Sequence, residues 1–230
     1  QTISQPVWKR RCFLDDPGED PGSDRVSLVK TLPRTTVLRP SLLALDGGRV
    51  ASGMEIEIAG DRISAVRPAT GPVDWNVCLL PGFVNGHSHA FQRGMRGLGE
   101  IFPDGAGSFF TWRASMYDLV ASLDPDRCHR ICRLAFDEML DAGITTVGEF
   151  HYVHHGIDEA WALDQAVLQA AADAGIRLVL LHCDYVRGGF DDRPLAGGQV
   201  RFDGGTVEDF LESFERVVAA CVGPLQSAAP

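Results

Sequence analysis

The chain has 230 residues, of which 45% are hydrophobic and 23% are charged, and its formal net charge is −10. This composition is typical of a globular protein that buries a core. The acidic balance argues against a surface that binds nucleic acid or an anionic membrane. No apolar run approaches the roughly 18 residues of a membrane span, and the start of the chain lacks the apolar segment of a signal peptide. We therefore expect neither nucleic acid nor a membrane among its partners.

The six cysteines are scattered, and none forms a C-x-x-C pair. Cys78 and Cys183 lie in apolar strand-like runs, and Cys128 and Cys132 are one helical turn apart. This pattern predicts reduced, mostly buried thiols in a cytoplasmic protein. Lysine occurs only twice, near the N-terminus, so the body of the chain offers no lysine for a Schiff base or a phosphate-binding loop.

The N-terminal part divides into a tail and a small β module. Residues 1–34 are rich in Asp, Gly, Pro and Arg without periodicity, which predicts a disordered tail. Between residues 35 and 77 the pattern becomes short strands. Met54, Ile56 and Ile58 alternate with other residues before the turn "AGDR", as in a hairpin. We expect residues 35–77 to form a small β-sandwich module and, since no initiator Met is present, the chain to be a piece of a longer protein.

Residues 78–230 alternate between strand and helix patterns. The predicted strands are "NVCLLPGFVNGHSH", which is apolar enough to be buried on both faces, then "ITTVGEFHYV" and "IRLVLLHCDYV". A helix pattern follows each strand. The first helix has Asp124 as its N-cap, and the third begins with a capping box of Thr206 and Asp209.

Consecutive strand–helix units at this spacing indicate a parallel sheet. Two architectures fit the pattern, a doubly wound sheet and a (β/α)₈ barrel. No G-x-G-x-x-G follows the first strand, so a dinucleotide-binding fold loses its main support.

Two histidines, His87 and His89, stand one residue apart at the end of the first of these strands. Residues i and i+2 of a strand face the same side, so the two imidazoles project together. They do so at the carboxyl end, where a barrel builds its active site, and two neutral imidazoles suit a zinc ion. Gly86 leaves room for a close approach. The alternative is a pair of loop histidines without a ligand.

The stretch "LPGFVNGHSHAFQRGMRG" resembles the start of the barrel in the amidohydrolase superfamily. The words "HSHAFQRGMRGL", "SFFTWRASMYDLV" and "EFHYVHH" are similar, more closely, to the formimidoylglutamate deiminase family of bacterial histidine degradation. The resemblance runs from about residue 37 to about residue 205. It implies an α/β fold: the N-terminal part of a metal-dependent amidohydrolase (β/α)₈ barrel with about three βα units, spanning 78–230, after the small β module.

The resemblance also implies a reaction and a set of site residues. Water activated at one divalent ion, zinc or another metal, attacks the formimino carbon of N-formimino-L-glutamate, and ammonia leaves. The metal ligands are His87 and His89, and the substrate-binding positions are Gln92, Arg113 and Tyr152. A glutamine offers both a donor and an acceptor, and an arginine grips a carboxylate in a bidentate fork.

Each of these residues has a structural alternative. Gln92 can cap a turn, Arg113 can be a solvated surface residue, and Tyr152 can be a half-buried residue at a strand end.

Other histidines of the chain are not assigned to the site. A second metal site in "HYVHH" (His151, His154, His155) is disfavoured because the family pattern uses the tyrosine, His182 suits a satisfied core position, and Glu149 has no assigned role.

The family's remaining ligands, a histidine and an aspartate, lie on later strands, as do its acid and base residues. We therefore assign no catalytic residue to this chain and expect it to be inactive alone, with a homodimer possible for the full-length protein.

Two other functional hypotheses stay open. One is a deaminase of the same superfamily that acts on a purine, pyrimidine or triazine ring, for which Arg113 is the discriminating residue. The other is a non-catalytic truncated fragment.

Overall fold

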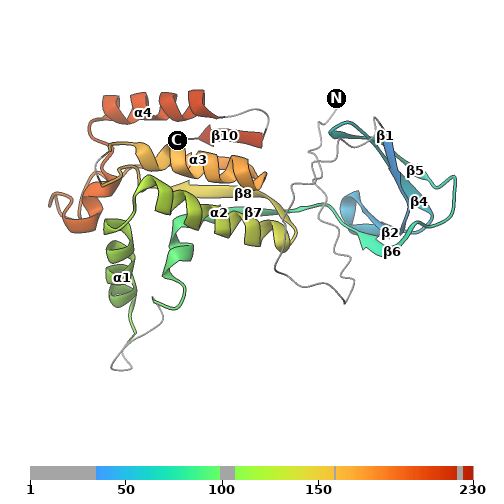
Figure 1. Ribbon diagram of the computed structural model, residues 1–230, viewed down its shortest axis with the longest axis horizontal. Coiled ribbons are helices and arrows are strands. Elements are labelled where there is room, and N and C mark those ends of the chain that lie inside the picture. The colour runs from blue at the N-terminus through green and yellow to red at the C-terminus, as the bar shows by residue number, and fades with distance from the viewer. Residues whose placement is uncertain (1–34, 99–106, 158, 222–224, 230) are drawn as a thin grey trace. The chain divides into compact units, whose positions relative to one another are not determined.

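The computed structural model describes residues 35–98, 107–157, 159–221 and 225–229 (Figure 1). The chain forms two compact units, Gln1–Gly82 and Phe83–Pro230. The tail predicted to be disordered, residues 1–34, lies outside the described residues. Within the described ranges, no helix combines the length and the apolar character needed to cross a membrane.

The first unit contains two three-stranded sheets. The predicted hairpin is present: β4 (Met54–Ala59) and β5 (Arg62–Pro68) pair antiparallel, with Glu57 opposite Ala65. The full strand orders are β1 (Thr35–Leu38), β4 and β5 in one sheet and β3 (Arg49–Ala51), β2 (Pro40–Leu45) and β6 (Trp75–Leu79) in the other.

The strand predicted over "NVCLLPGFVNGHSH" is two strands in two units. Its first part belongs to β6, which pairs with β2 of the first unit, and its second part is β7 (Phe83–Ser88) of the second unit. Pro81 lies between them and has no N–H to continue a ladder. The boundary between the units therefore follows Gly82, five residues later than the predicted boundary at 77.

The expectation that this stretch is buried on both faces is wrong. Phe83 and Val84 are 55% and 70% exposed, and Cys78 is exposed as well. For Phe83 and Val84 the physical reason is that β7 is an edge strand, which pairs with β8 alone among the described strands; Cys78 lies in β6 of the first unit. An apolar run alone cannot distinguish an edge strand from a central one.

The second unit is built on a four-stranded parallel sheet rather than the three strands expected. The order is β7, β8 (Ile144–His151), β9 (Arg177–His182) and β10 (Gln226–Ala229), which is also the chain order. The strand missed by the sequence prediction, β10, has the short sequence "QSAA" without a branched apolar residue. Neighbouring strands in chain order are those of a (β/α) barrel, but the described strands form an open sheet with edges at β7 and β10.

The helices of the second unit follow the predicted signals. Asp124 caps α2 (Pro125–Asp141) by accepting a hydrogen bond from the Arg127 N–H. The capping box of Thr206 and Asp209 opens α4 (Val207–Ala220), and α3 (Ala162–Ala174) ends at Gly175 in a left-handed conformation. The helix α1 (Phe109–Ala121) was not predicted; a capping box of Ser108 and Thr111 opens it.

The core of this unit lies between the sheet and helices α2 and α3, which pack against each other (Figure 1). Strand β8 separates two environments. Val147, Glu149 and His151 are buried on the helix side of the sheet. Phe150 and Tyr152, which are two positions apart, line a pocket on the other side. The alternation of a strand therefore divides the site from the core.

Candidate functional site

A pocket of about 590 Å³ lies beyond the carboxyl ends of β7 and β8. All five residues that the sequence predicted as metal-binding or substrate-binding line it: His87, His89, Gln92, Arg113 and Tyr152. They come from three segments of the chain, namely the end of β7 with the turn after it, helix α1 and the end of β8. The fold thus brings together residues that are up to 65 positions apart in the sequence (152 − 87).

The two histidines of the pocket face each other. His87 Nε2 and His89 Nε2 are 3.1 Å apart, and the rings meet edge to face. His89 Nδ1 lies 2.9 Å from the carbonyl oxygen of Phe150. A carbonyl only accepts, so Nδ1 carries the proton and Nε2 of His89 presents a lone pair toward His87. A metal-ligating histidine has this arrangement, in which one ring nitrogen donates to a carbonyl and the other is free for the ion.

Electrostatics favour the neutral ring at this position. Burial lowers the pKa of His89, the hydrogen bond to Phe150 opposes this shift, and the neighbouring His87 adds to it. Metal binding requires the neutral imidazole. The pair therefore fits a divalent ion in geometry and in charge, although a catalytic zinc site normally has three protein ligands.

The close approach of strands β7 and β8 depends on Gly148, whereas the predicted role of Gly86, to leave room at the metal, stays a prediction. A Cβ atom built on Gly86 would meet nothing within 4 Å, but one on Gly148 would lie 2.9 Å from the Gly86 carbonyl oxygen. Real Cβ atoms essentially never come so close to a backbone oxygen. The glycine in β8 is therefore what lets β7, with its two histidines, lie close against β8.

Gln92 and Tyr152 form one hydrogen-bonded pair. The Gln92 amide donates to the Tyr152 hydroxyl at 3.0 Å. Burial raises the pKa of the Tyr152 phenol well above its usual range, while the bond from Gln92 opposes that shift. The phenol is therefore protonated at neutral pH and, since its oxygen already accepts from Gln92, its O–H is available to donate into the pocket.

Arg113 lies on the pocket side of α1 against aromatic rings. Its guanidinium carbon is 5.2 Å from the centre of the Phe110 ring and 5.6 Å from that of Phe109. Within the described part of the chain, no carboxylate forms an ion pair with it. As far as the described residues go, the five N–H donors are available to a ligand.

A second guanidinium at the pocket was missed by the sequence prediction. Arg187 lines the pocket and forms an ion pair with Asp192 at 2.7 Å, in which both side chains are exposed. Tyr185, which also lines the pocket, precedes it. Tyr185 lies near the end of the third predicted strand and Arg187 follows it directly, whereas β9 of the structure ends at His182. Side chains beyond the carboxyl end of a barrel strand are candidates for the site.

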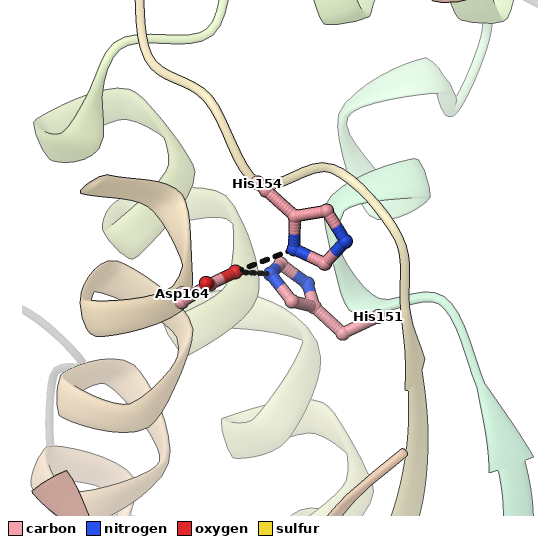
Figure 2. Close-up of side chains that lie close together, drawn as sticks. All are labelled: His151, His154 and Asp164. Carbon is pink, nitrogen blue, oxygen red and sulfur yellow. Dashed lines mark hydrogen bonds and ion pairs between the residues drawn. The ribbon is translucent and has the colours of Figure 1, made fainter. Parts of the chain in front are cut away.

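A separate cluster of ionisable residues lies behind the sheet (Figure 2). Asp164 Oδ1 is 2.7 Å from His151 Nε2 and 2.8 Å from His154 Nδ1, and all three residues are buried. These atoms lie within 4.8 Å of one another, as in a metal site. The sequence prediction missed Asp164; the available signal was a carboxylate on the apolar face of an Ala-rich helix.

The distances between the polar atoms of this cluster are those of hydrogen bonds rather than those between ligands of one metal ion. The bonds of 2.7 and 2.8 Å are those of charge-assisted hydrogen bonds. Ligands about 2.0 Å from a tetrahedral zinc lie about 3.3 Å from each other. His154 Nε2 also faces an oxygen, the Cys183 carbonyl at 2.8 Å, so both nitrogens of this ring face acceptors. Burial opposes ionisation of Asp164, but the bonds from His151 and His154 outweigh it and hold the pKa of the carboxyl well below its usual range.

Two further histidines, His155 and His182, bond to oxygen atoms elsewhere. His155 bonds through Nε2 to the Asp203 carbonyl oxygen at 2.7 Å. His182 is buried, and its Nε2 lies 2.9 Å from the Ser213 hydroxyl. His182 is thus a core histidine that is only half satisfied, because its Nδ1 has no partner among the described atoms. A second metal site in "HYVHH", which the sequence disfavours, has His151 and His154 with Asp164 as its candidate group.

Two curated deaminases are similar to this chain in sequence. A formimidoylglutamate deiminase from Pseudomonas aeruginosa is 42% identical over 187 residues, which cover 77% of this chain and 40% of that enzyme. A 5-methylthioadenosine/S-adenosylhomocysteine deaminase from Syntrophobacter fumaroxidans is 31% identical over 144 residues, covering 60% of this chain and 32% of that protein. The chain therefore spans less than half the length of these curated relatives.

Solved structures show the same fold. An amidohydrolase from Brucella melitensis has a TM-score of 0.73 at 32% identity, over 84% of this chain and 45% of that one. Other structures of this fold, at lower identity, contain zinc. The model of the amidohydrolase family matches residues 78–225, which is more than half of the chain. The chain belongs to the amidohydrolase family.

Proposed function

We propose that this chain supplies part of the active site of a zinc-dependent deiminase that hydrolyses N-formimino-L-glutamate to N-formyl-L-glutamate and ammonia. What carries the proposal is that His87, His89, Gln92, Arg113 and Tyr152 line one pocket at the carboxyl ends of parallel strands. The 42% identity to formimidoylglutamate deiminase, whose name states this type of reaction, supports the choice of substrate.

In this proposal the metal is held by His87 and His89, with Phe150 orienting the second ring through its carbonyl. When bound, a zinc ion supplies a water of lowered pKa as the nucleophile. Two histidines fall short of the three protein ligands of a catalytic zinc site, so the remaining ligands and the acid and base residues are assigned to later strands.

The substrate-binding roles follow from the contacts. The unpaired guanidinium of Arg113 binds a carboxylate of the substrate, and the phenol O–H of Tyr152 donates a second hydrogen bond. Gln92 orients that phenol by donating to its oxygen. A dicarboxylate with a polar formimino end needs donors of this kind, because each buried oxygen must find a partner.

A second candidate is a deaminase acting on a nucleobase-like ring. The observation that favours it is the aromatic lining of the pocket, which includes Phe109, Trp112, Tyr117 and Phe150. Aromatic walls stack on planar rings. Arg113 argues for the first candidate, since a neutral ring offers no carboxylate to its guanidinium fork.

Steady-state ammonia release separates the two candidates. The protein expressed from its complete reading frame is assayed with N-formimino-L-glutamate, guanine, cytosine and S-adenosylhomocysteine, and the 230-residue chain is assayed alongside it. We expect turnover of formimino-glutamate only, and no turnover by the 230-residue chain because it provides two ligands. Turnover of a ring substrate without turnover of formimino-glutamate would support the second candidate. No turnover of any substrate would support a non-catalytic protein.

The cellular setting is part of the same proposal. The described cysteines, Cys78, Cys128, Cys132, Cys183 and Cys221, are free thiols, in line with a reducing compartment. We propose a cytoplasmic enzyme that acts on a small molecule and forms a homodimer. Fractionation and light scattering on the complete protein test the two statements.

A further inference from the structure

Glu149 is a buried carboxylate with no role in the proposed reaction. It lies in β8 and is 1% exposed. Its Oε1 accepts a hydrogen bond of 2.6 Å from the backbone N–H of Ala90, the residue after His89. The side chain of Ser88, the residue before His89, is a second hydrogen-bond partner of the carboxyl and pairs with Glu149 in the sheet register.

The next residue on β8 acts on the same histidine. The Phe150 carbonyl accepts from His89 Nδ1 at 2.9 Å, which fixes the orientation of the ring. Glu149 holds the backbone after that ring through the Ala90 N–H and contacts the side chain of Ser88 before it. Two consecutive residues of β8 thus hold the backbone and the imidazole of His89.

Burial of this carboxyl is unfavourable in itself. Its Oε2 has no hydrogen-bond partner among the described atoms. Burial raises the pKa of Glu149 to about 7, while the bonds from Ala90 and Ser88 oppose the shift. An apolar side chain would fill this position at a lower desolvation cost, so the contact to Ala90 is the distinctive contribution of Glu149.

We propose that Glu149 is a positioning residue for metal binding, which holds the turn after β7 so that His89 Nε2 faces His87 Nε2. The inference rests on the proposed function in one respect, namely that His87 and His89 are the metal ligands. Glu149 does not touch the ion or the substrate in this scheme; it acts through the backbone N–H of Ala90 and the side chain of Ser88.

The test compares four variants of the protein expressed from its complete reading frame. Glu149→Ala removes the acceptor, Glu149→Gln keeps an oxygen for the Ala90 N–H, and Val147→Ala is a control cavity on the same buried face of β8. His89→Ala removes the proposed ligand itself. Two quantities are measured: the zinc dissociation constant, by competition with a chromophoric chelator, and the tautomer of His89, from its ring ¹⁵N shifts in the zinc-free protein.

We expect Glu149→Ala to weaken zinc binding by about 10–100-fold, as is usual for residues that orient a ligand. The His89 ring should lose its single Nδ1–H tautomer. Glu149→Gln should keep both properties close to those of the unchanged protein, and Val147→Ala should lower thermal stability without affecting zinc.

Two results overturn the proposal: a loss of zinc affinity in Glu149→Ala no larger than in Val147→Ala, or an unchanged His89 tautomer. Retention of zinc by His89→Ala overturns the proposed metal site instead, so the two failures are distinguishable. If Glu149→Ala does not fold, Ala90→Pro removes the N–H donor at the first residue of a helical turn, where proline is tolerated. That variant should show the same loss of zinc affinity, and normal affinity in it would contradict the proposal.

Discussion

Two histidine clusters lie on opposite faces of strand β8, and their surroundings differ. In the pocket, His87 and His89 point nitrogen toward nitrogen, with a lone pair directed at the space between the rings. Behind the sheet, His151 and His154 point nitrogen toward oxygen, at Asp164 (Figure 2). The first arrangement offers nitrogen lone pairs to a cation, whereas in the second the nitrogens directed at Asp164 are held by hydrogen bonds and His151 Nδ1 has no partner among the described atoms.

The difference teaches that a histidine pair is a candidate metal site when one nitrogen of each ring faces its partner ring rather than an acceptor oxygen. The buried cluster has the residue types of a metal site and is the more compact of the two. The Asp164 carboxylate of this cluster already accepts hydrogen bonds from both rings. The cluster therefore has a structural role, in which it links the end of β8 to helix α3. In the pocket pair the two Nε2 atoms face each other at 3.1 Å.

The largest expected effect is on zinc content. We expect His87→Ala, in the protein from the complete reading frame, to lose nearly all bound zinc and nearly all turnover, because the two strand neighbours share one ion. Asp164→Asn should keep its zinc. Atomic emission on dialysed protein measures the zinc bound per chain. Loss of zinc from Asp164→Asn but not from His87→Ala would mean that the buried cluster, and not the pocket pair, binds the metal.

The next effect is on the free energy of unfolding. Here the buried cluster should show the larger loss and the pocket pair the smaller one. Asp164→Asn removes the charge that pairs with two buried rings, which typically costs about 3–5 kcal/mol. His89→Ala, in a half-exposed pocket, should cost clearly less in the metal-free protein. Urea unfolding at pH 7 gives both free energies of unfolding. Equal losses would mean that Asp164 is not the centre of a structural cluster.

The sequence predicted the pocket better than it predicted the cluster. His87 and His89 follow from the period of a strand, and the family resemblance adds Gln92, Arg113 and Tyr152. Each of these five needed only its own segment to be identified. The contact between them in one pocket is a consequence of parallel strands ending at the same edge.

Tertiary partners were beyond the reach of the sequence pattern. Asp164 meets His151 only because α3 packs behind β8, and Glu149 meets Ala90 across 59 positions of sequence. The strand β10 has so weak a pattern that only its pairing with β9 identifies it. The caps of α2 and α4 were correct because a cap is a local interaction.

A third effect concerns the substrate and sharpens the role of the pocket. Arg113→Met should weaken binding of formimino-glutamate by a factor on the order of 10–150, the worth of a charge-assisted hydrogen bond of about 1.5–3 kcal/mol. A neutral formamidine analogue should be affected much less. KM and kcat are measured for both compounds. Arg187→Met is the matched control, since that guanidinium already pairs with Asp192 and should contribute less; equal losses on both compounds would make Arg113 structural.

The smallest effect is a pH dependence at the rim of the buried cluster. His182 Nε2 donates to the Ser213 hydroxyl, which in turn donates to the Phe210 carbonyl, and His182 Nδ1 has no partner among the described atoms. Burial lowers the pKa of His182 to about 4; Asp164 opposes the shift, and the neighbouring histidines add to it. The folded protein therefore keeps this ring neutral in mildly acidic solution.

The sign of the effect follows from the two protonation states. An unfolded histidine titrates near 6.5, so between pH 6.5 and about 4 the unfolded chain binds a proton that the folded ring does not. The free energy of unfolding is therefore highest above pH 6.5 and falls as the pH decreases through this window, by about 1–2 kcal/mol at pH 5.5 to 5. His182→Gln keeps a donor for Ser213 but cannot titrate. Urea unfolding of both proteins from pH 7 to pH 5 should show a shallower acid decline for His182→Gln, and parallel curves would show that His182 does not limit the acid stability of the cluster.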